Sequence, residues 1–180
     1  LKCEDVLWMI KYNDHPEGII TIDTETNGDF HLYDGRTYGI GMSIAGMFDS
    51  VLKGYGYYPY RHIADNLSHD EWDQLRVAIE NFKGYIAFFN AKHDLVSLQT
   101  MGINYTGKFY DALLMCHLID ENRPYSKTLD ACAAKYLGSE HQKLNDDAFK
   151  AAVKVLGFGG LPVSMMYAYA AQDANLTYDL

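Results

Sequence analysis

The first third of the chain alternates short apolar runs with turn-forming residues, a pattern typical of β-strands. A β-branched run at 18–23 predicts a buried strand, and apolar runs at 37–45 and 51–60 predict two more. The residues at 46–49, which begin with glycine and end with aspartate, predict the turn between the second and third strands. Three strands joined in succession indicate a meander.

After residue 67 the spacing of apolar residues becomes helical. Ser68 has the side chain of a helix N-cap, and Trp72, Leu75 and Ile79 follow it on one helical face. An apolar strand is predicted at 85–90. Further helical segments are expected at 95–101, 112–119, 129–137, 147–156 and 163–180. A meander followed by alternating helices and strands predicts an α/β domain with a mixed sheet flanked by helices.

Composition fits a single folded domain over residues 1–180. Hydrophobic residues make up 48% of the chain and charged residues 22%, values that exclude a disordered protein. No apolar run approaches the roughly 20 residues that a bilayer-spanning helix needs, so no membrane partner is expected. The three cysteines lack the spacing of a zinc site or a disulfide framework, which favours a reducing compartment. We expect the cytoplasm, with the cytoplasm of a virus-infected host or an organelle as alternatives.

Charge narrows the class of function. The 24 acidic and 15 basic residues give a net charge of −9, which argues against a protein that coats nucleic acid. The same balance is compatible with an enzyme that holds metal cations among its carboxylates. A locally basic stretch from Arg123 to Lys143 either meets the phosphates of a single strand or forms a solvated helix face. Neither this stretch nor the tyrosine-rich third strand has an assigned role.

The tripeptide Asp23-Thr24-Glu25 comes directly after the first apolar run. Side chains two residues apart on an extended segment point to the same face, so the two carboxylates converge on one point. Such a pair repels unless a cation lies between its members. Taken alone, the tripeptide also fits solvated acids in a loop.

Two later pairs place further polar groups on helices. Asn90 follows an apolar strand, and Asp94 falls in the first turn of the next helix, where either a helix cap or a functional pair fits. Tyr169 and Asp173 are four residues apart and therefore share a helix face. Tyr167 does not have that spacing.

Together, D-x-E, N-x-x-x-D and Y-x-x-x-D in this order resemble the three motifs of the DEDD superfamily of 3′-5′ exonucleases. The stretch FYDALLMCHLIDENRPYSKTLDACAAKYLG and the ending YAAQDANLTYDL resemble the proofreading domain of DNA polymerase I and other family-A DNA polymerases. The resemblance covers roughly 19–180 and implies a ribonuclease-H-like fold. Tyr169 corresponds to the residue that defines the tyrosine subclass; the histidine subclass would need histidine at 168, where this chain has alanine.

The resemblance implies a site for two divalent metal ions, Mg²⁺ or Mn²⁺. Asp23 would bridge both ions. Glu25 and Asp173 would complete the ion that binds the attacking water, and Asp94 would hold the second ion, partly through water. Hard cations prefer oxygen ligands, which four carboxylates supply.

The remaining site residues are expected to handle the water and the substrate. Tyr169 would orient the attacking water by a hydrogen bond, because its ordinary pKa makes it a poor base at neutral pH. Thr24, Thr26 and Asn90 would contact the terminal nucleotide. The implied substrate is the 3′ end of single-stranded DNA, which would be released as nucleoside monophosphates.

The resemblance also implies a polymerase as the parent protein, and two alternative functions stay open. Because the chain begins at Leu1 without an initiator methionine, we expect a piece excised from a larger polymerase, with a polymerase domain in the same parent chain. A ribonuclease D-like 3′-5′ exoribonuclease is the alternative within the superfamily. A non-catalytic nucleic-acid-binding domain is the alternative of another class.

Overall fold

The computed structural model of the chain describes residues 2–27, 37–122, 127–138 and 147–180. Its centre is a five-stranded sheet of order β3-β2-β1-β4-β5. The strands are β1 (Ile19–Asn27), β2 (Tyr38–Met47), β3 (Lys53–Pro59), β4 (Tyr85–Phe88) and β5 (Lys108–Asp111). The first three are antiparallel, whereas β4 runs parallel to β1 and β5 parallel to β4. This is the mixed sheet that the sequence predicts.

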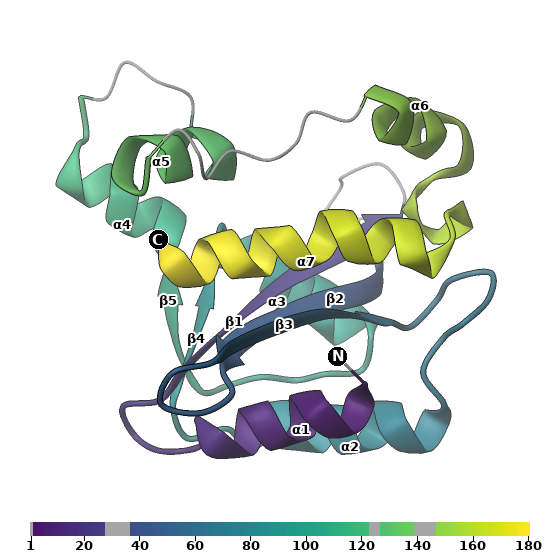
Figure 1. Cartoon of the computed structure of the whole chain (residues 1–180), viewed down its shortest axis with the longest axis horizontal. Helices are drawn as coiled ribbons and strands as arrows, with labels where there is room; N and C mark the ends of the chain where they lie inside the picture. The colour runs from purple at the N-terminus through teal and green to yellow at the C-terminus, as the bar shows by residue number, and fades with distance from the viewer. Residues whose placement is uncertain (1, 28–36, 123–126, 139–146) are drawn as a thin grey trace.

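Helices cover both faces of the sheet (Figure 1). The first group, packed on one face, comprises α1 (Cys3–Tyr12), α2 (His69–Glu80) and α3 (Ala91–Thr100). The long helix α7 (Val163–Asp179) crosses the other face over β1, β2 and β3. At the ends of α7 stand α4 (Ala112–Ile119) and α5 (Leu129–Tyr136), and, opposite them, α6 (Asp147–Leu156) with the short helix η2 (Phe158–Gly160).

Alternation along β1 divides its side chains between two environments. Ile20 and Ile22 are fully buried in the large core that α1, α2 and α3 form with the sheet. Thr21 lies on the other side, where its hydroxyl donates a hydrogen bond to the Ala174 carbonyl of α7, 2.8 Å away. A smaller core beneath α7 joins Tyr57 of β3 with residues of α6 and α7. The sheet is therefore buried on both faces, and α7 is attached directly to its central strand.

Parts of the secondary structure differ from the sequence-based expectation. The predicted turn at 46–49 is wrong in its first half, because Gly46 and Met47 pair with Gly54 and Lys53 and so belong to β2. The helix α1 was not predicted at all. Its Trp8 is 46% exposed and stacks on Tyr12 of the same helix and on Phe48 of the hairpin, so it packs at the surface.

The start of α2 follows the expected capping chemistry. The Ser68 hydroxyl accepts a hydrogen bond from the Glu71 backbone N–H, and the Glu71 carboxylate accepts one in return from the Ser68 N–H. In the described part of the chain, no helix is long and apolar enough to cross a membrane.

Candidate active site

Three carboxylates from two distant parts of the chain meet beneath α7. Asp23 and Glu25 of β1 and Asp173 of α7 each offer an oxygen, and these oxygens all lie within 4.8 Å of one another. Glu25 and Asp173 are buried, whereas Asp23 is half-buried. Carboxylates held this close repel one another unless protons or cations offset their charge. Their oxygen-only donor set suits Mg²⁺ or Mn²⁺.

The position of this cluster follows from strand register. Asp23 and Glu25 pair with Ser43 and Gly41 of β2, so both lie inside β1. The sequence-based expectation that they lie at the end of the strand is wrong, because β1 continues to Asn27. A register shift follows between Glu25 and Thr26, where the strand is irregular. Such bulges commonly adjust the direction of side chains near functional sites.

Asp94 lies outside the three-carboxylate cluster, and hydrogen bonds from Thr24 hold its carboxylate. Its Oδ1 accepts two hydrogen bonds from Thr24, one from the backbone N–H at 2.9 Å and one from the hydroxyl at 2.8 Å. Burial raises the pKa of Asp94, although hydrogen bonds from His93 and Thr24 act in the opposite direction. Because Thr24 alternates with Asp23 and Glu25 along β1, Asp94 reaches the strand from the side of α3.

Tyr169 lies one helical turn before Asp173 and packs within an aromatic group. Its ring centre is 4.5 Å from that of Phe149 in α6 and 6.0 Å from that of Phe158 in η2. Burial, followed by the charges of Glu25 and Asp23, raises the pKa of Tyr169 to about 12. The phenol therefore stays protonated at neutral pH and is suited to donate a hydrogen bond, not to accept a proton.

The neighbouring Tyr167 faces another part of the fold. Its hydroxyl donates a hydrogen bond to the backbone carbonyl of Tyr55 in β3, 3.2 Å away. Burial raises the pKa of Tyr167, and the nearby Tyr55 raises it further. The distinction that the sequence spacing draws between Tyr167 and Tyr169 is therefore visible in their surroundings.

Tyr57 of β3 is a neighbour of the cluster that the sequence analysis missed. Its hydroxyl lies 2.6 Å from Nε2 of the buried His62, and a side chain at Gly41 would collide with it. The His62 Nδ1 lies 3.4 Å from the carbonyl of Leu161, which can only accept a hydrogen bond. Burial raises the pKa of Tyr57, and the charges of Glu25 and Asp23 raise it further. The available sequence signal was the tyrosine-rich third strand.

The residues expected to contact a nucleotide differ in their surroundings. Thr24 is buried and bound to Asp94, whereas Thr26 is half-buried. Asn90 is exposed, adopts a left-handed backbone conformation with φ of 79°, and makes no side-chain cap hydrogen bond. The carboxylate of Asp111 takes over that role, because it accepts hydrogen bonds from the N–H groups of Asn90 and Ala91. Asn90 therefore occupies the N-cap position of α3, but its side chain does not supply the capping hydrogen bond.

The basic stretch is only partly within the described residues. Lys127 and Lys135 are exposed, whereas Arg123 and Lys143 lie outside the described ranges.

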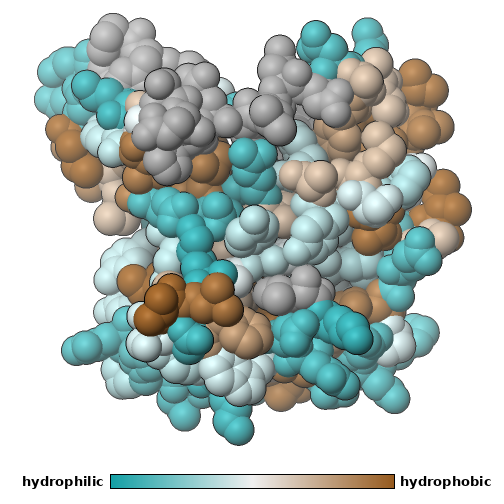
Figure 2. All heavy atoms as spheres, in the orientation of Figure 1, coloured by the Kyte–Doolittle hydropathy of each residue, from teal (hydrophilic) through white to brown (hydrophobic). Residues whose placement is uncertain are grey.

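Exposed apolar side chains gather over α6 (Figure 2), where Val155 is 81% and Leu156 is 55% exposed.

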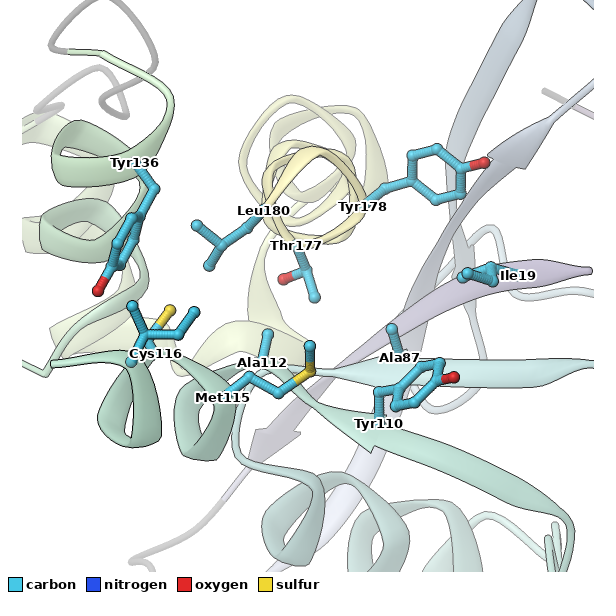
Figure 3. A pocket seen from close by; sticks show the side chains of 11 residues that line it. Ile19, Ala87, Tyr110, Ala112, Met115, Cys116, Tyr136, Thr177, Tyr178 and Leu180 are labelled. Carbon is cyan, nitrogen blue, oxygen red and sulfur yellow. The ribbon is translucent and has the colours of Figure 1, made fainter. Parts of the chain in front are cut away.

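A separate cavity of about 290 Å³ lies at the far end of α7. Figure 3 shows Thr177 of α7 facing Ala112 and Met115 of α4 across it, and Leu180, which follows α7, on the side of Tyr136. Its lining includes none of the carboxylates of the cluster. The cavity is therefore distinct from the site that Asp23, Glu25 and Asp173 form.

Comparison with known proteins supplies a family for this arrangement. Residues 6–180 match the sequence pattern of a 3′-5′ exonuclease family. DNA polymerase I of Borreliella burgdorferi is 28% identical over 166 residues, which cover 89% of this chain and 16% of that protein. The chain thus spans less than a fifth of the length of this curated relative.

A solved structure shares the fold. The apo form of a nuclease superposes with a TM-score of 0.58 at 15% sequence identity, over 99% of this chain and 73% of that one. At this identity the likeness shows the fold alone, and it agrees with the ribonuclease-H-like architecture expected from the sequence.

Proposed function

The chain belongs to the 3′-5′ exonuclease family found in DNA polymerase I, and we propose that it removes nucleotides from DNA 3′ ends with two divalent metal ions. The observation that carries the proposal is the meeting of Asp23, Glu25 and Asp173 within 4.8 Å. One strand and one helix that are distant in sequence supply these three acids.

The side chains fit the ions that this chemistry needs. Asp23, Glu25 and Asp173 would hold them, with Asp94 contributing from the α3 side, and all four offer the hard oxygen ligands that Mg²⁺ and Mn²⁺ prefer. When bound, a pair of such ions lowers the pKa of water and stabilises negative charge on the leaving 3′ oxygen.

The chain itself would orient the reacting groups. Tyr169, kept protonated by its raised pKa, would donate a hydrogen bond to the attacking water. Its stacking on Phe149 and Phe158 limits the freedom of the ring and so keeps the hydroxyl close to the carboxylates. Thr26 and the exposed Asn90 would contact the terminal nucleotide.

We assign the domain a proofreading role as part of a family-A-like DNA polymerase. The match to a DNA polymerase I supports this context. A site of this kind accepts unpaired nucleotides, because the terminal phosphodiester has to reach the carboxylates, and a mispaired end is already partly unpaired.

Degradation of matched oligonucleotides tests the proposal. Labelled single-stranded DNA and RNA of the same sequence would be incubated with the protein and Mg²⁺ or Mn²⁺, with the label at the 5′ end. We expect a ladder of products shortened from the 3′ end of DNA, which EDTA abolishes. Faster degradation of RNA would favour the ribonuclease D-like alternative, and no degradation with either metal would contradict the enzymatic function.

A further inference from the structure

Arg61 follows β3, and its guanidinium contacts Gly39 of β2, which pairs with Thr26 just after the two carboxylates of β1. We propose that its guanidinium binds a phosphate of the single-stranded substrate a short distance beyond the bond that is cut. The inference rests on the proposed exonuclease function, and it adds a binding residue that the sequence motifs do not contain.

Two tyrosines and a carbonyl hold the guanidinium in place. Its central carbon lies 4.8 Å from the ring centre of Tyr60 and 5.7 Å from that of Tyr38, and Nη1 donates a hydrogen bond to the Gly39 carbonyl at 3.5 Å. Tyr60 is itself stacked on the buried Trp72, with ring centres 4.3 Å apart. A side chain restrained in this way loses little conformational freedom when it binds a ligand.

Strand register places this arginine next to the cluster. Glu25 pairs with Gly41, and the next residue of β1 pairs with Gly39, which accepts the hydrogen bond from Arg61. Gly39 and Gly41 are two residues apart, or about 7 Å along the strand at roughly 3.3 Å per residue. Phosphates of a stacked strand are spaced by about 3.4 Å along its axis, so a neighbouring phosphate falls within this range.

Charge gives the second reason. Arg61 is exposed, and no carboxylate of the described residues forms an ion pair with it. Arg76 on α2 behaves differently, because its guanidinium contacts Asp73 at 3.2 Å and Glu80 at 2.9 Å. In a chain of net charge −9, Arg61 keeps a cation available at the edge of an acidic site.

The chemistry of the group fits a phosphodiester. A planar guanidinium offers paired N–H donors that match two phosphate oxygens, and it stacks on aromatic rings without losing them. The exposed ring of Tyr38 beside it adds a surface on which a base can stack. We therefore assign this corner to the strand that leads to the terminal nucleotide.

The test measures binding in EDTA, where metal-dependent hydrolysis is absent. Fluorescence anisotropy would follow a labelled oligothymidylate of about ten nucleotides with the wild type, Arg61→Gln, Arg61→Lys and the control Arg76→Gln, between about 25 and 200 mM NaCl. Arg61→Gln should raise Kd about tenfold and reduce the salt slope by about 0.7, the value for one phosphate on a single strand. Arg61→Lys should fall in between, because it keeps the charge without the planar fork.

The control variant and a second substrate separate the possible outcomes. Arg76→Gln should leave both Kd and the salt slope at their wild-type values. Equal binding by Arg61→Gln and the wild type, equal losses in the two glutamine variants, or no binding by the wild type would each overturn the assignment. Hydrolysis of the p-nitrophenyl ester of thymidine 5′-phosphate by the wild type with Mn²⁺ tests the proposed function by itself. If this ester is not hydrolysed, the proposed function is contradicted, while the anisotropy measurement still tests whether Arg61 binds the oligonucleotide.

Discussion

The carboxylate of Asp94 accepts hydrogen bonds from both the backbone N–H and the hydroxyl of Thr24, at 2.9 and 2.8 Å. Thr24 stands between Asp23 and Glu25 on β1, so this contact joins the start of α3 to the strand that carries the other acids. Asp94 is 1% exposed, and burial raises its pKa, whereas hydrogen bonds from His93 and from these two donors lower it. The threonine of the D-x-E motif is therefore a structural partner of the fourth acid.

Replacing Thr24 by valine should destabilise the fold. The shape of the side chain is nearly kept, but the buried Asp94 loses a hydrogen bond from the hydroxyl, and bonds to charged groups contribute about 1.5–3 kcal/mol. Urea unfolding at neutral pH measures the loss. Thr26→Val, on the same strand but half-buried, is the matched control and should change the free energy of unfolding by less than about 0.5 kcal/mol. Equal losses in the two variants would contradict the role given to this bond.

Asp23→Ala should abolish hydrolysis without unfolding the domain. The substitution removes one member of the three-carboxylate cluster and relieves its repulsion, so the melting temperature without metal should be unchanged or higher. Nuclease rate under saturating Mg²⁺ and thermal melting would be measured together. Asp73→Ala, on the surface of α2, is the control and should keep full activity. More than about a tenth of the wild-type rate in Asp23→Ala would show that this acid is not a metal ligand.

Tyr169→Phe should slow the reaction without weakening metal binding. The variant keeps the stacked ring but removes the hydroxyl, and loss of one group that positions a proton costs up to about 10²-fold in rate. Single-turnover rates and titration with Mn²⁺ would separate the two quantities. Tyr167→Phe removes a hydroxyl that binds the Tyr55 carbonyl and should leave the rate nearly unchanged. Similar losses at both positions would mean that the hydroxyl of Tyr169 has no special part.

His62 should make the domain less stable in mild acid. Burial lowers the pKa of His62, although its hydrogen bond to the Leu161 backbone acts in the opposite direction. Its folded-state pKa is therefore below the ordinary value of about 6.5, and the unfolded chain binds more protons as pH falls through that range. The stability contribution is fully present above about pH 6.5 and is lost below it, by at most about 1.4 kcal/mol per pH unit for one proton.

Urea unfolding between about pH 7.5 and 5 would follow this loss. His62→Gln removes the titration and should have a flatter dependence of unfolding free energy on pH, whereas His69→Gln at the exposed start of α2 should behave as the wild type. The same slope in His62→Gln and the wild type would assign the acid sensitivity to other groups.

The form of the substrate should control the rate. A matched duplex end has to be unpaired before its terminal phosphodiester reaches the carboxylates, at a cost of roughly 1.4 kcal/mol for each stacked step. We expect single strands to be digested fastest, then mismatched 3′ ends, and then matched ends, with the differences narrowing at higher temperature. Single-turnover rates on three labelled substrates measure the order. Equal rates on single-stranded DNA and on matched duplex ends at low temperature would contradict the proofreading role. They would not contradict the nuclease activity.

Local periodicity determined much of the architecture from the sequence alone. Helical spacing of apolar residues after Ser68 predicted α2, α4, α6 and α7 closely, and Gly157 marked the end of α6, because these signals act within a few residues. The same local rules put Asp23 and Glu25 on one face of a strand, and Tyr169 and Asp173 on one face of a helix. Weaker local signals left α1 and the first half of the predicted turn unrecognised or misplaced.

Only the tertiary structure decided which of these groups meet. The hydrogen bond from Thr21 to the Ala174 carbonyl joins α7 to β1 and so brings Asp173 to the two acids of the strand. Asp94 is directed to Thr24, and Arg61 lies beside Gly39, through contacts between residues far apart in the chain. Such contacts depend on strand register and on how helices pack across the sheet, and a local sequence pattern contains neither. The sequence by itself therefore determined the chemical groups and their faces, and packing determined the site that they form.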